Sequence, residues 1–458
     1  MSSELFGTDG IRGIPGRYPL VPDLVRKLGF VASGVMLRRG GRPGPLNGSP
    51  PPILIGRDSR ASGAALSRQL AQGFAKAGCA AIDAGVIPTP ALSYLVPRRG
   101  VLFGAMVSAS HNPAEFNGIK FFTRDGFKMG PDLEKRIEAG LESAQDPGSG
   151  SPRLIDGAAA AARDYADFLR STFPVDLDLR GKKIAVDCAN GAASKIAPRL
   201  LRSLGADVFA VGCSPDGTNI NRRCGALDTR ALCREVRRRG CACGVAFDGD
   251  ADRAVFADER GRPCDGDLLL SMLAADLREK RLLRGGTVVL TVMSNYGLIR
   301  WLGGLGIKTV TVPVGDRNVT EAIEKERLSL GGESSGHIVL RRFAPTGDGL
   351  LTALQILAIL VREGRPLSAF RERYRAYPQV LRNVRVDRRV PLEDLPETGR
   401  RIRAGEERLR GAGRVFVRYS GTEPLLRILV EGPRAAEVRG IAEEIASVFS
   451  KEMRTHAG

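Results

Sequence analysis

The chain has 458 residues, which is too long for one hydrophobic core and predicts three or four domains. With 43% hydrophobic and 26% charged residues it has the composition of an ordinary globular protein, and charge interrupts its longest apolar runs, which excludes a membrane span. The formal net charge of +18 would suit nucleic acid, an anionic surface or anionic substrates, but only 5% of residues are aromatic, so we expect no nucleic-acid partner.

The beginning of the chain carries no signal-peptide pattern, so we expect a cytoplasmic protein with reduced thiols. Seven of the eight cysteines lie between Cys188 and Cys264, which raises the alternative of a zinc site. The spacing Cys241-Ala-Cys243 lacks a CxxC knuckle, however. We interpret these cysteines as small buried apolar residues.

Three segments repeat one order of predicted elements: an apolar strand, a helix, a glycine and a second apolar strand. Gly78, Gly205 and Gly306 stand where each helix should end with a left-handed residue. Strands that are apolar throughout are typical of a parallel sheet covered on both faces. The predicted elements are strand 52–58, helix 63–77 and strand 79–84; strand 183–188, helix 194–204 and strand 207–211; and strand 286–292, helix 296–305 and strand 308–312.

After about Tyr377 the order changes, and a smaller α+β domain is predicted, while the breaker-rich stretch Ala144–Pro152 indicates a linker. We therefore predict an α/β protein of three homologous α/β domains, with mixed and mostly parallel sheets, plus the smaller C-terminal α+β domain. The predicted boundaries are 1–150, 151–254, 255–376 and 377–458. The last domain is predicted to contain strands 381–387, 414–419 and 425–431 and helices 393–410 and 435–453.

The apolar run Val101–Val107 predicts a buried strand. The turn that follows it, Ser108–Pro113 (SASHNP), contains two serines and a histidine. The carboxyl end of a strand is where open α/β sheets bind their ligands. A serine there can act as a nucleophile once a base or an electrophile activates it.

Alternating acidic residues form the loop Asp248–Arg253 (DGDADR) after a second apolar run. Three carboxylates this close repel one another without a cation, and their hard oxygens suit Mg²⁺. An EF-hand is the alternative, and Glu259 stands at its twelfth position, but Arg253 occupies the position that requires glycine. We predict a Mg²⁺ site with Asp248, Asp250 and Asp252 as ligands and one further oxygen from elsewhere.

Two of the three histidines, His111 and His337, lie in polar loops, and the third is in the tail. A helix is predicted at 320–327, and the glycine-rich loop Gly331–His337 (GGESSGH) follows it. His337 ends this loop, where it has little packing to do, so proton transfer is the favoured role. The glutamate and serines of this loop are suited to sugar hydroxyls, and its glycines allow close approach of the backbone.

Three further motifs are weak when taken singly. Arg418–Pro424 (RYSGTEP) offers a guanidinium, hydroxyls and backbone N–H groups for a phosphate, with Arg427 as a second guanidinium; its alternative is a plain hairpin loop. Leu5–Gly13 and Asn117–Lys120 contribute Arg12 and Lys120 as charged groups of interest, although a surface lysine is the ordinary interpretation.

In chain order the motifs FGTDGIRG (6–13), SASHNP (108–113), NGIK (117–120), DGDADR (248–253), GESSGH (332–337) and SGTEP (420–424) resemble those of the α-D-phosphohexomutases. The resemblance covers nearly the whole chain and is strongest to the bacterial members that act on glucosamine phosphates. It implies an isomerase whose four domains surround a central cleft and which interconverts glucosamine 6-phosphate and glucosamine 1-phosphate through a phosphoserine enzyme and a bisphosphorylated sugar. Members that act on glucose or mannose phosphates are the alternative.

The resemblance also implies roles for individual residues. It implies Ser110 as the phosphoserine and fourth Mg²⁺ ligand, and an activating sugar bisphosphate or other phosphoryl donor. A hexosamine phosphate is the implied partner, and a homodimer is left open. The implied catalytic residues are Ser110, Lys120, His337, Arg12 and Arg253, and the implied substrate-binding residues are His111, Glu333, Ser335, Arg418, Ser420, Gly421, Thr422 and Arg427.

Three positions depart from the pattern of the family. Ala251 replaces a common glycine in the metal loop, and Tyr419 replaces a common proline; neither change removes a ligand or a phosphate donor. Ser334 stands where the amino-sugar enzymes often carry an amide, and it bears on specificity.

Overall fold

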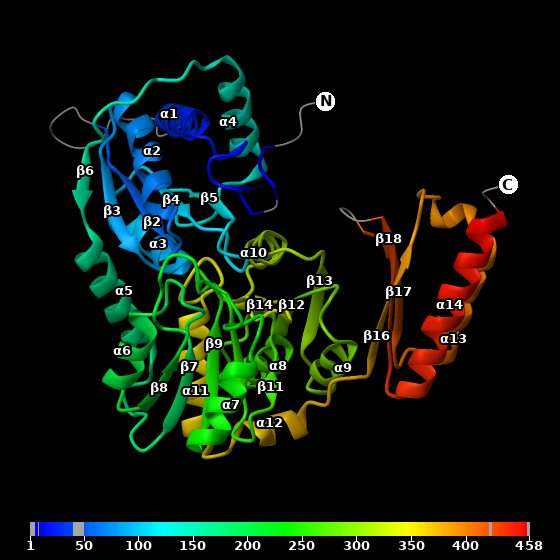
Figure 1. The fold of residues 1–458 in the computed structure, drawn as a ribbon. Helices are drawn as coiled ribbons and strands as arrows, with labels where there is room; N and C mark the ends of the chain where they lie inside the picture. Colours follow the sequence, from blue (N-terminus) through cyan, green and yellow to red (C-terminus); the bar gives the residue numbers. More distant parts are fainter. Residues whose placement is uncertain (1–4, 8, 40–49, 421–423, 456–458) are drawn as a thin grey trace. The chain divides into compact units, whose positions relative to one another are not determined.

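The computed structural model describes residues 5–7, 9–39, 50–420 and 424–455. The chain forms two compact units (Figure 1). The first unit takes in Met1–Val292 and Val310–Phe370, and the second takes in Met293–Thr309 and Arg371–Gly458. Among the described residues, no helix is long and apolar enough to cross a membrane.

The first α/β repeat is a six-stranded sheet with a large apolar core. Helices α1 (Pro22–Arg39), α2 (Gly63–Lys76) and α4 (Pro131–Ser143) bury their apolar sides against the sheet, while α3 (Thr89–Leu95) and α5 (Ala158–Thr172) also pack on its strands (Figure 1). The sheet order is β1 (Ile11–Gly13), β5 (Asn117–Phe122), β4 (Gly104–Val107), β2 (Ile53–Arg57), β3 (Ala81–Val86) and β6 (Leu154–Asp156).

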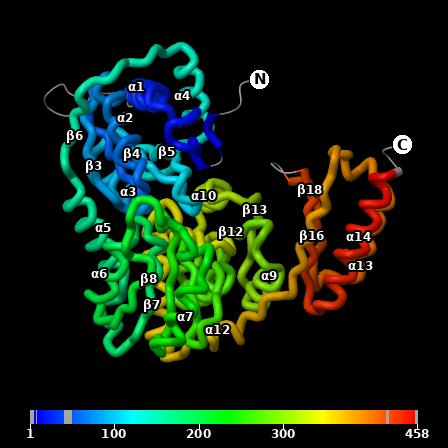
Figure 2. Tube along the Cα trace, in the orientation of Figure 1, coloured from blue at the N-terminus to red at the C-terminus, as the bar shows by residue number. Residues whose placement is uncertain are grey.

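The second repeat is smaller and follows the same plan. Helices α6 (Ile196–Ser203) and α7 (Arg230–Arg239) flank its parallel strands (Figure 2). The sheet order is β11 (Pro263–Cys264), β10 (Ala254–Ala257), β9 (Cys243–Phe247), β7 (Lys183–Asp187) and β8 (Asp207–Val211).

The third sheet has four strands. Helices α8 (Gly266–Glu279), α10 (Asp316–Lys325) and α11 (Gly349–Glu363) pack on its strands, and α12 (Leu367–Arg373) follows. Helix α9 (Tyr296–Gly304) belongs to the second unit. The sheet order is β13 (Lys308–Val312), β12 (Thr287–Thr291), β14 (Leu330–Gly332) and β15 (Ile338–Leu340).

Four neighbouring strands have the same order in all three sheets: β5-β4-β2-β3, β10-β9-β7-β8 and β15-β14-β12-β13. Strands β4, β9 and β14 occupy the same place in their sheets, where each pairs in parallel with β2, β7 or β12. Each is followed in the chain by an antiparallel partner, which is β5, β10 or β15. The loop between those two strands carries Ser110 in the first repeat, Asp248–Asp252 in the second and Glu333–His337 in the third. Three chemically different motifs therefore occupy one structural position.

Helix ends agree with the glycines predicted to close them. Gly78, Gly205 and Gly306 have φ values of 83°, 97° and 72°, in the left-handed region. The helix predicted from residue 320 instead begins at Asp316, because Gly315 leads into it and an acidic first residue favours a helix start. It ends at Lys325, and Arg327 is left-handed with a φ of 53°.

The second unit contains a three-stranded antiparallel sheet covered on one face by two helices (Figure 1). This is the predicted α+β arrangement. The sheet order is β16 (Gln379–Arg385), β18 (Leu425–Glu431) and β17 (Arg414–Tyr419), and the helices are α13 (Pro396–Leu409) and α14 (Ala435–Thr455). Strand β16 begins two residues before the prediction because Gln379 pairs with Glu431 at the end of β18.

All eight cysteines are free thiols. Seven are buried and Cys213 is half-buried, in agreement with their interpretation as small apolar residues.

Candidate active site

The equivalent loops of the three repeats meet at one pocket of about 480 Å³ in the first unit. Seven of the residues predicted from the sequence line it, and so do Asp9 and Asp316, for which no role is predicted. The predicted residues are Arg12, Ser110, His111, Asp252, Arg253, Glu333 and His337.

Ser110 is buried at the carboxyl end of β4 and has a φ of 50°, in the left-handed region that serine rarely adopts. Such a conformation costs roughly 1–2 kcal/mol and persists only where its surroundings hold it. Its amide donates to the Ser108 hydroxyl at 2.9 Å, and its carbonyl accepts from Arg60 at 3.0 Å and from the Asn221 side chain at 2.9 Å. These hydrogen bonds hold the strained backbone of Ser110 in place, and the backbone in turn positions its hydroxyl.

An ion pair between Asp58 and Arg60 lies fully buried behind this loop. The Arg60 guanidinium also donates to the carbonyls of Ser110 and Asn112, and Asp58 accepts from the Ser108 hydroxyl at 2.7 Å. A buried charge pair is stable only when such further bonds satisfy it. The pair thus positions the serine loop, a role that the sequence did not indicate.

Asp248, Asp250 and Asp252 are buried, with carboxylate oxygens within 4.8 Å of one another. The Ser110 hydroxyl donates to Asp248 at 2.6 Å. One oxygen each of Asp250 and Asp252 is buried without a hydrogen-bond partner among the described residues. Burial, reinforced by the charges of Asp252 and Asp250, raises the pKa of Asp248 well above its ordinary value.

These observations fit a hard divalent cation. A cation beside the three carboxylates would satisfy the unpartnered oxygens and offset the repulsion among the carboxylates. Ala251, between two of the ligands, has a φ of 58°, so alanine holds a left-handed conformation that glycine would adopt without strain.

The loops of the first and second repeats are joined around these groups. The hydroxyl of Thr89 donates to the Asp250 carboxylate at 2.6 Å, and its amide donates to the Asp250 carbonyl at 2.9 Å. Asn221 holds the Ser110 carbonyl, as described above. A Cβ at Gly249 would lie 2.5 Å from that carbonyl oxygen, so only glycine allows this close approach. The serine and the carboxylates are thus held at a fixed separation.

Lys120 is buried, with its ammonium group 2.8 Å from Asp9 and 3.2 Å from Asp250. Burial opposes the charge, but the carboxylates of Asp250 and Asp9 raise the pKa of Lys120. The protonated amine can donate a proton or stabilise negative charge, but it cannot accept a proton. Lys128, which the sequence did not single out, forms ion pairs with both Asp9 and Asp316.

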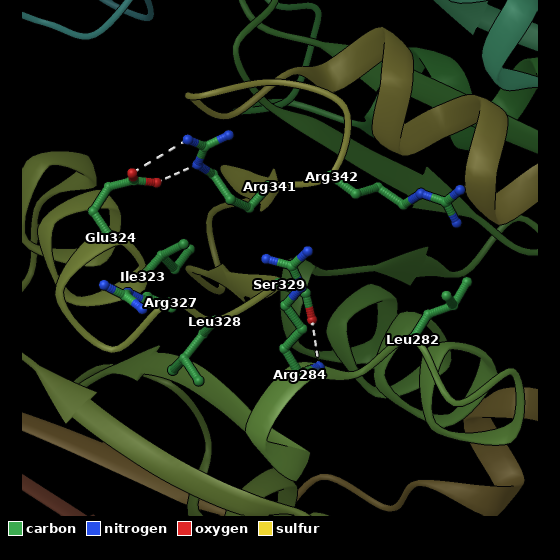
Figure 3. Close-up of a pocket in the computed structure, with 9 residues that line it drawn as sticks. All are labelled: Leu282, Arg284, Ile323, Glu324, Arg327, Leu328, Ser329, Arg341 and Arg342. Atoms are coloured by element: carbon green, nitrogen blue, oxygen red, sulfur yellow. Dashed lines mark hydrogen bonds and ion pairs between the residues drawn. The ribbon is translucent and has the colours of Figure 1, made fainter.

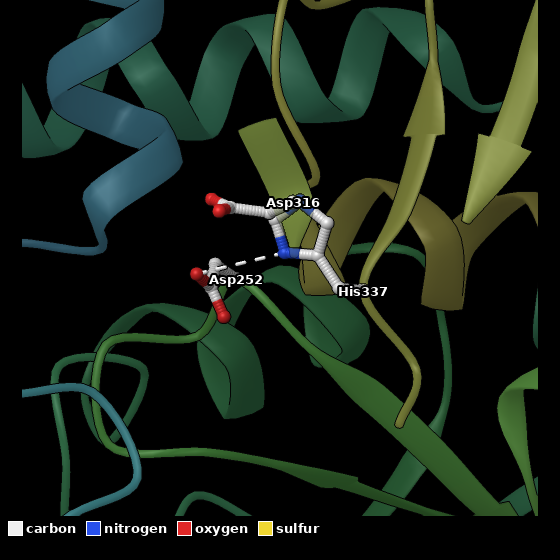
Figure 4. A group of neighbouring side chains, drawn as sticks. All are labelled: Asp252, Asp316 and His337. Carbon is white, nitrogen blue, oxygen red and sulfur yellow. Dashed lines mark ion pairs between the residues drawn. The ribbon is translucent and has the colours of Figure 1, made fainter. Parts of the chain in front are cut away.

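His337 lies beside Asp252 and Asp316, and its Nδ1 is 3.6 Å from an Asp252 oxygen (Figure 4). Burial disfavours the charged ring, but the nearby carboxylates, that of Asp252 above all, raise the pKa of His337. A Cβ at Gly347 would lie 2.3 Å from Nε2, so that glycine makes room for the ring.

His111 differs from His337 in charge and in position. Burial and the nearby cations Arg253 and Arg12 lower the pKa of His111 to about 4, so its ring is neutral at pH 7. Its Nδ1 is 3.4 Å from the Ser110 hydroxyl oxygen. A neutral ring at this distance can exchange a proton with the serine.

The carboxylate of Glu333 lies at the pocket wall, where it accepts from the Gly315 amide at 3.0 Å and from the Ser335 hydroxyl at 3.2 Å. Ser335 therefore orients Glu333. Arg12 reaches the pocket with its guanidinium bonded to Asn112 and Asp9. Carboxylates that can accept hydrogen bonds and guanidiniums that can attract an anion thus line the same pocket.

Family models match the chain in four consecutive parts. They are described as the alpha/beta/alpha domains I, II and III and the C-terminal domain of phosphoglucomutase/phosphomannomutase, and they match residues 3–147, 163–261, 265–377 and 381–448. The chain belongs to the phosphoglucomutase/phosphomannomutase family.

Relatives in this family match the chain from end to end. The phosphoglucosamine mutase of Rhodospirillum rubrum is 44% identical over 452 residues, which is 97% of this chain and 98% of that protein. The phosphoglucosamine mutase of Syntrophotalea carbinolica is 41% identical over 461 residues, which is 99% of this chain and 98% of that protein.

A crystal structure of a phosphoglucomutase/phosphomannomutase family protein from Burkholderia thailandensis has a TM-score of 0.79 to this chain at 23% identity. The match covers 99% of this chain and 98% of the Burkholderia thailandensis chain, so the two proteins share a fold. The predicted fold class and the predicted family are both confirmed.

The C-terminal unit of this phosphoglucomutase/phosphomannomutase family member contains the remaining predicted residues. Arg418 on β17 lies directly opposite Arg427 on β18 in the antiparallel ladder. Like charges opposite one another are destabilising unless an anion or another partner offsets them. Ser420, just after β17, is buried. Gly421 and Thr422 lie outside the described residues.

Proposed function

We propose that the chain is a phosphoglucosamine mutase, which interconverts glucosamine 6-phosphate and glucosamine 1-phosphate. The observation that carries the proposal is the Ser110 hydroxyl, held by a strained backbone against one of three buried carboxylates at the wall of a pocket. The relatives named phosphoglucosamine mutase, 41% and 44% identical over nearly the whole chain, supply the substrate.

We further propose that the enzyme acts with phosphorylated Ser110. The bond from the Ser110 oxygen to phosphorus breaks, and a bond from phosphorus to the free sugar hydroxyl forms, which gives a bisphosphorylated sugar. This intermediate turns end for end, and Ser110 takes back the phosphoryl group from the other end. The first phosphoryl group comes from an activating sugar bisphosphate or another phosphoryl donor.

Asp248, Asp250, Asp252 and Ser110 would hold Mg²⁺, which supplies positive charge for the oxygens of the transferring phosphoryl group. Arg12 and Arg253, at the same pocket, add further positive charge. The sugar hydroxyl must lose a proton as it attacks, and Lys120 and His337 are the proposed proton-transfer residues. The neighbouring carboxylates favour the protonated form of both groups, so each has to release its own proton before it can accept the proton of the hydroxyl. His111, Glu333 and Ser335 are proposed to bind the sugar phosphate.

The C-terminal unit is proposed to bind the phosphate that does not react, through Arg418, Ser420, Gly421, Thr422 and Arg427. The domain boundaries at 150, 254 and 376, a cytoplasmic location and a homodimer also stay proposals.

The substrate preference tests the amino-sugar assignment. We expect glucosamine phosphate to give the highest kcat/KM, with measurable activity on glucose phosphate behind it. Glu333 suits sugar hydroxyls, but Ser334 is short and nothing in this loop is specific for a 2-ammonium group. Discrimination is large only where a poor substrate leaves a buried polar group unpaired.

The measurement is a coupled assay with glucosamine, N-acetylglucosamine, glucose and mannose phosphates at equal enzyme concentration. A higher kcat/KM for glucose or mannose phosphate would overturn the amino-sugar assignment and favour the alternative mutase of the same family.

Replacing Arg418 with alanine tests the phosphate role of the C-terminal unit. A well-aligned guanidinium–phosphate contact contributes about 1.5–3 kcal/mol, so we expect kcat/KM to fall by roughly 10-fold to 100-fold. Both KM and kcat should change, because binding energy at the distant phosphate positions the reacting end.

Arg385→Ala is the matched control, because Arg385 is an exposed arginine on a strand of the same sheet. Its kinetics should stay close to those of the unmodified enzyme. If Arg418→Ala also leaves the kinetics unchanged, the loop after β17 is an ordinary hairpin without a role in phosphate binding.

A further inference from the structure

A second pocket, of about 580 Å³, lies in the third repeat and shares no lining residue with the candidate active site (Figure 3). Four of its nine lining residues are arginines and one is a glutamate. The lining residues are Leu282, Arg284, Ile323, Glu324, Arg327, Leu328, Ser329, Arg341 and Arg342.

Three of these arginines have no counterion within the described part of the chain. Glu324 forms an ion pair with Arg341 (Figure 3), whereas none of the ion pairs between described residues includes Arg284, Arg327 or Arg342. Figure 3 shows Arg327 and Arg342 on opposite sides of Arg284. Three positive charges therefore share one concave surface, where an anion would relieve their mutual repulsion.

Each of these arginines comes from a different connection between elements. Arg284 lies between α8 and β12, Arg327 follows α10, and Arg342 follows β15. The left-handed φ of 53° at Arg327 lets the chain turn directly after the helix ends. The fold thus brings three distant parts of the sequence together at one pocket.

Three lining residues of the pocket are apolar. Ile323 and Leu328 are buried, and Leu282, on the other side of Arg284 in Figure 3, is 39% exposed. The Ser329 hydroxyl accepts from the Arg284 amide at 3.0 Å, which fixes the backbone of that arginine (Figure 3). A small ligand with a charged part for the guanidiniums and an apolar part for these side chains is complementary to this surface.

We propose that this pocket binds a small molecule bearing phosphate groups, with Arg284, Arg327 and Arg342 as the residues that hold the phosphate oxygens. Planar guanidiniums suit phosphate because each can donate two parallel hydrogen bonds. A concave pocket of this size suits a metabolite and is too small for a nucleic-acid duplex.

The position of the pocket relates it to the active site through three elements. Strand β14 lies between Ser329 at this pocket and Glu333 at the active site, and β15 lies between His337 at the active site and Arg341 at this pocket. Helix α10 runs from Asp316 at the active site to Ile323 and Glu324 at this pocket. A ligand here would contact the opposite ends of the elements that carry active-site residues.

The test is hydrogen–deuterium exchange of the full-length enzyme, titrated with inorganic pyrophosphate at low salt without metal. We expect slower amide exchange in residues 282–286, 326–330 and 341–343, which line the proposed site. In the triple variant Arg284→Gln, Arg327→Gln and Arg342→Gln, the pyrophosphate concentration that gives half of this protection should rise by about 100-fold or more, because three charge-assisted contacts are lost.

A second triple variant, Arg68→Gln, Arg199→Gln and Arg234→Gln, removes the same charge from exposed helix positions of the first unit and should keep the protection. Pyrophosphate bound at the active site would slow amide exchange in other segments, so it does not affect this comparison. The proposal is overturned if pyrophosphate leaves these three segments unprotected, or if the first triple variant is protected as well as the second. Protection by a single-stranded oligonucleotide but not by pyrophosphate would also overturn it.

Discussion

The Ser110→Ala enzyme is expected to lose turnover by about 10⁴-fold or more, because the residue proposed to carry the phosphoryl group is removed. The Ser110 hydroxyl is the group that the left-handed backbone aims at Asp248. A neighbouring hydroxyl cannot replace it, because Ser108 is bonded to Asp58 on the other side of the loop.

Ser108→Ala is the control for a purely structural effect. It removes the acceptor for the Ser110 amide and one partner of Asp58, so it should reduce activity through poorer positioning of the loop, and by less than Ser110→Ala. Thermal unfolding of both variants checks the fold. Intact-mass and peptide analysis of the unmodified enzyme should place a stable phosphate on Ser110; phosphate on Ser108 would contradict the assignment.

The second large effect is expected from the metal loop. Asp250→Asn should lower turnover by about 10²-fold or more, since it removes a ligand charge beside the developing phosphoryl charge. The substitution also leaves the ammonium group of Lys120 without one of its two carboxylate partners. Asp248→Asn and Asp252→Asn should act in the same direction, and excess EDTA should inactivate the unmodified enzyme.

Asp258→Asn provides the matched control. Asp258 is a fully buried aspartate of the same repeat, but it pairs with Arg262 and does not belong to the carboxylate cluster. Its loss can destabilise the fold, yet Mn²⁺ binding measured by electron paramagnetic resonance should persist, whereas Asp250→Asn should weaken that binding. Full activity of the metal-free enzyme in EDTA would refute the metal site.

Much of the fold could be predicted from local sequence. The glycines Gly78, Gly205 and Gly306 give the helix ends because a left-handed residue is a local requirement. The antiparallel strand β5 was not predicted, although its motif was noticed, because its pairing with β4 and β1 is decided by residues far away in the chain. Similarly, α10 begins four residues early because of Gly315 and Asp316, which the pattern of apolar residues does not reveal.

The candidate site was predictable where chemistry is concentrated in one short motif. Three aspartates in five residues predict a cation site without any structure. The supporting residues were not predictable, because each acts through a contact across the fold. Arg60 holds the carbonyl of Ser110 fifty positions away, and Thr89 holds Asp250 from another repeat. In the sequence, such residues look like any other arginine or threonine.

Hydrogen bonds join the first and second repeats at the site where both half-reactions of the mutase take place. Thr89 and Asn221 fix the carboxylates and Ser110 to one another, so their relative geometry stays constant while the proposed intermediate turns. The sugar therefore has to present two chemically different oxygens, on C1 and C6, to the same rigid geometry. The residues that bind the sugar, and not those that transfer the phosphoryl group, therefore have to accept both orientations of the sugar. Selection for a new substrate can act on these sugar-binding residues without disturbing phosphoryl transfer.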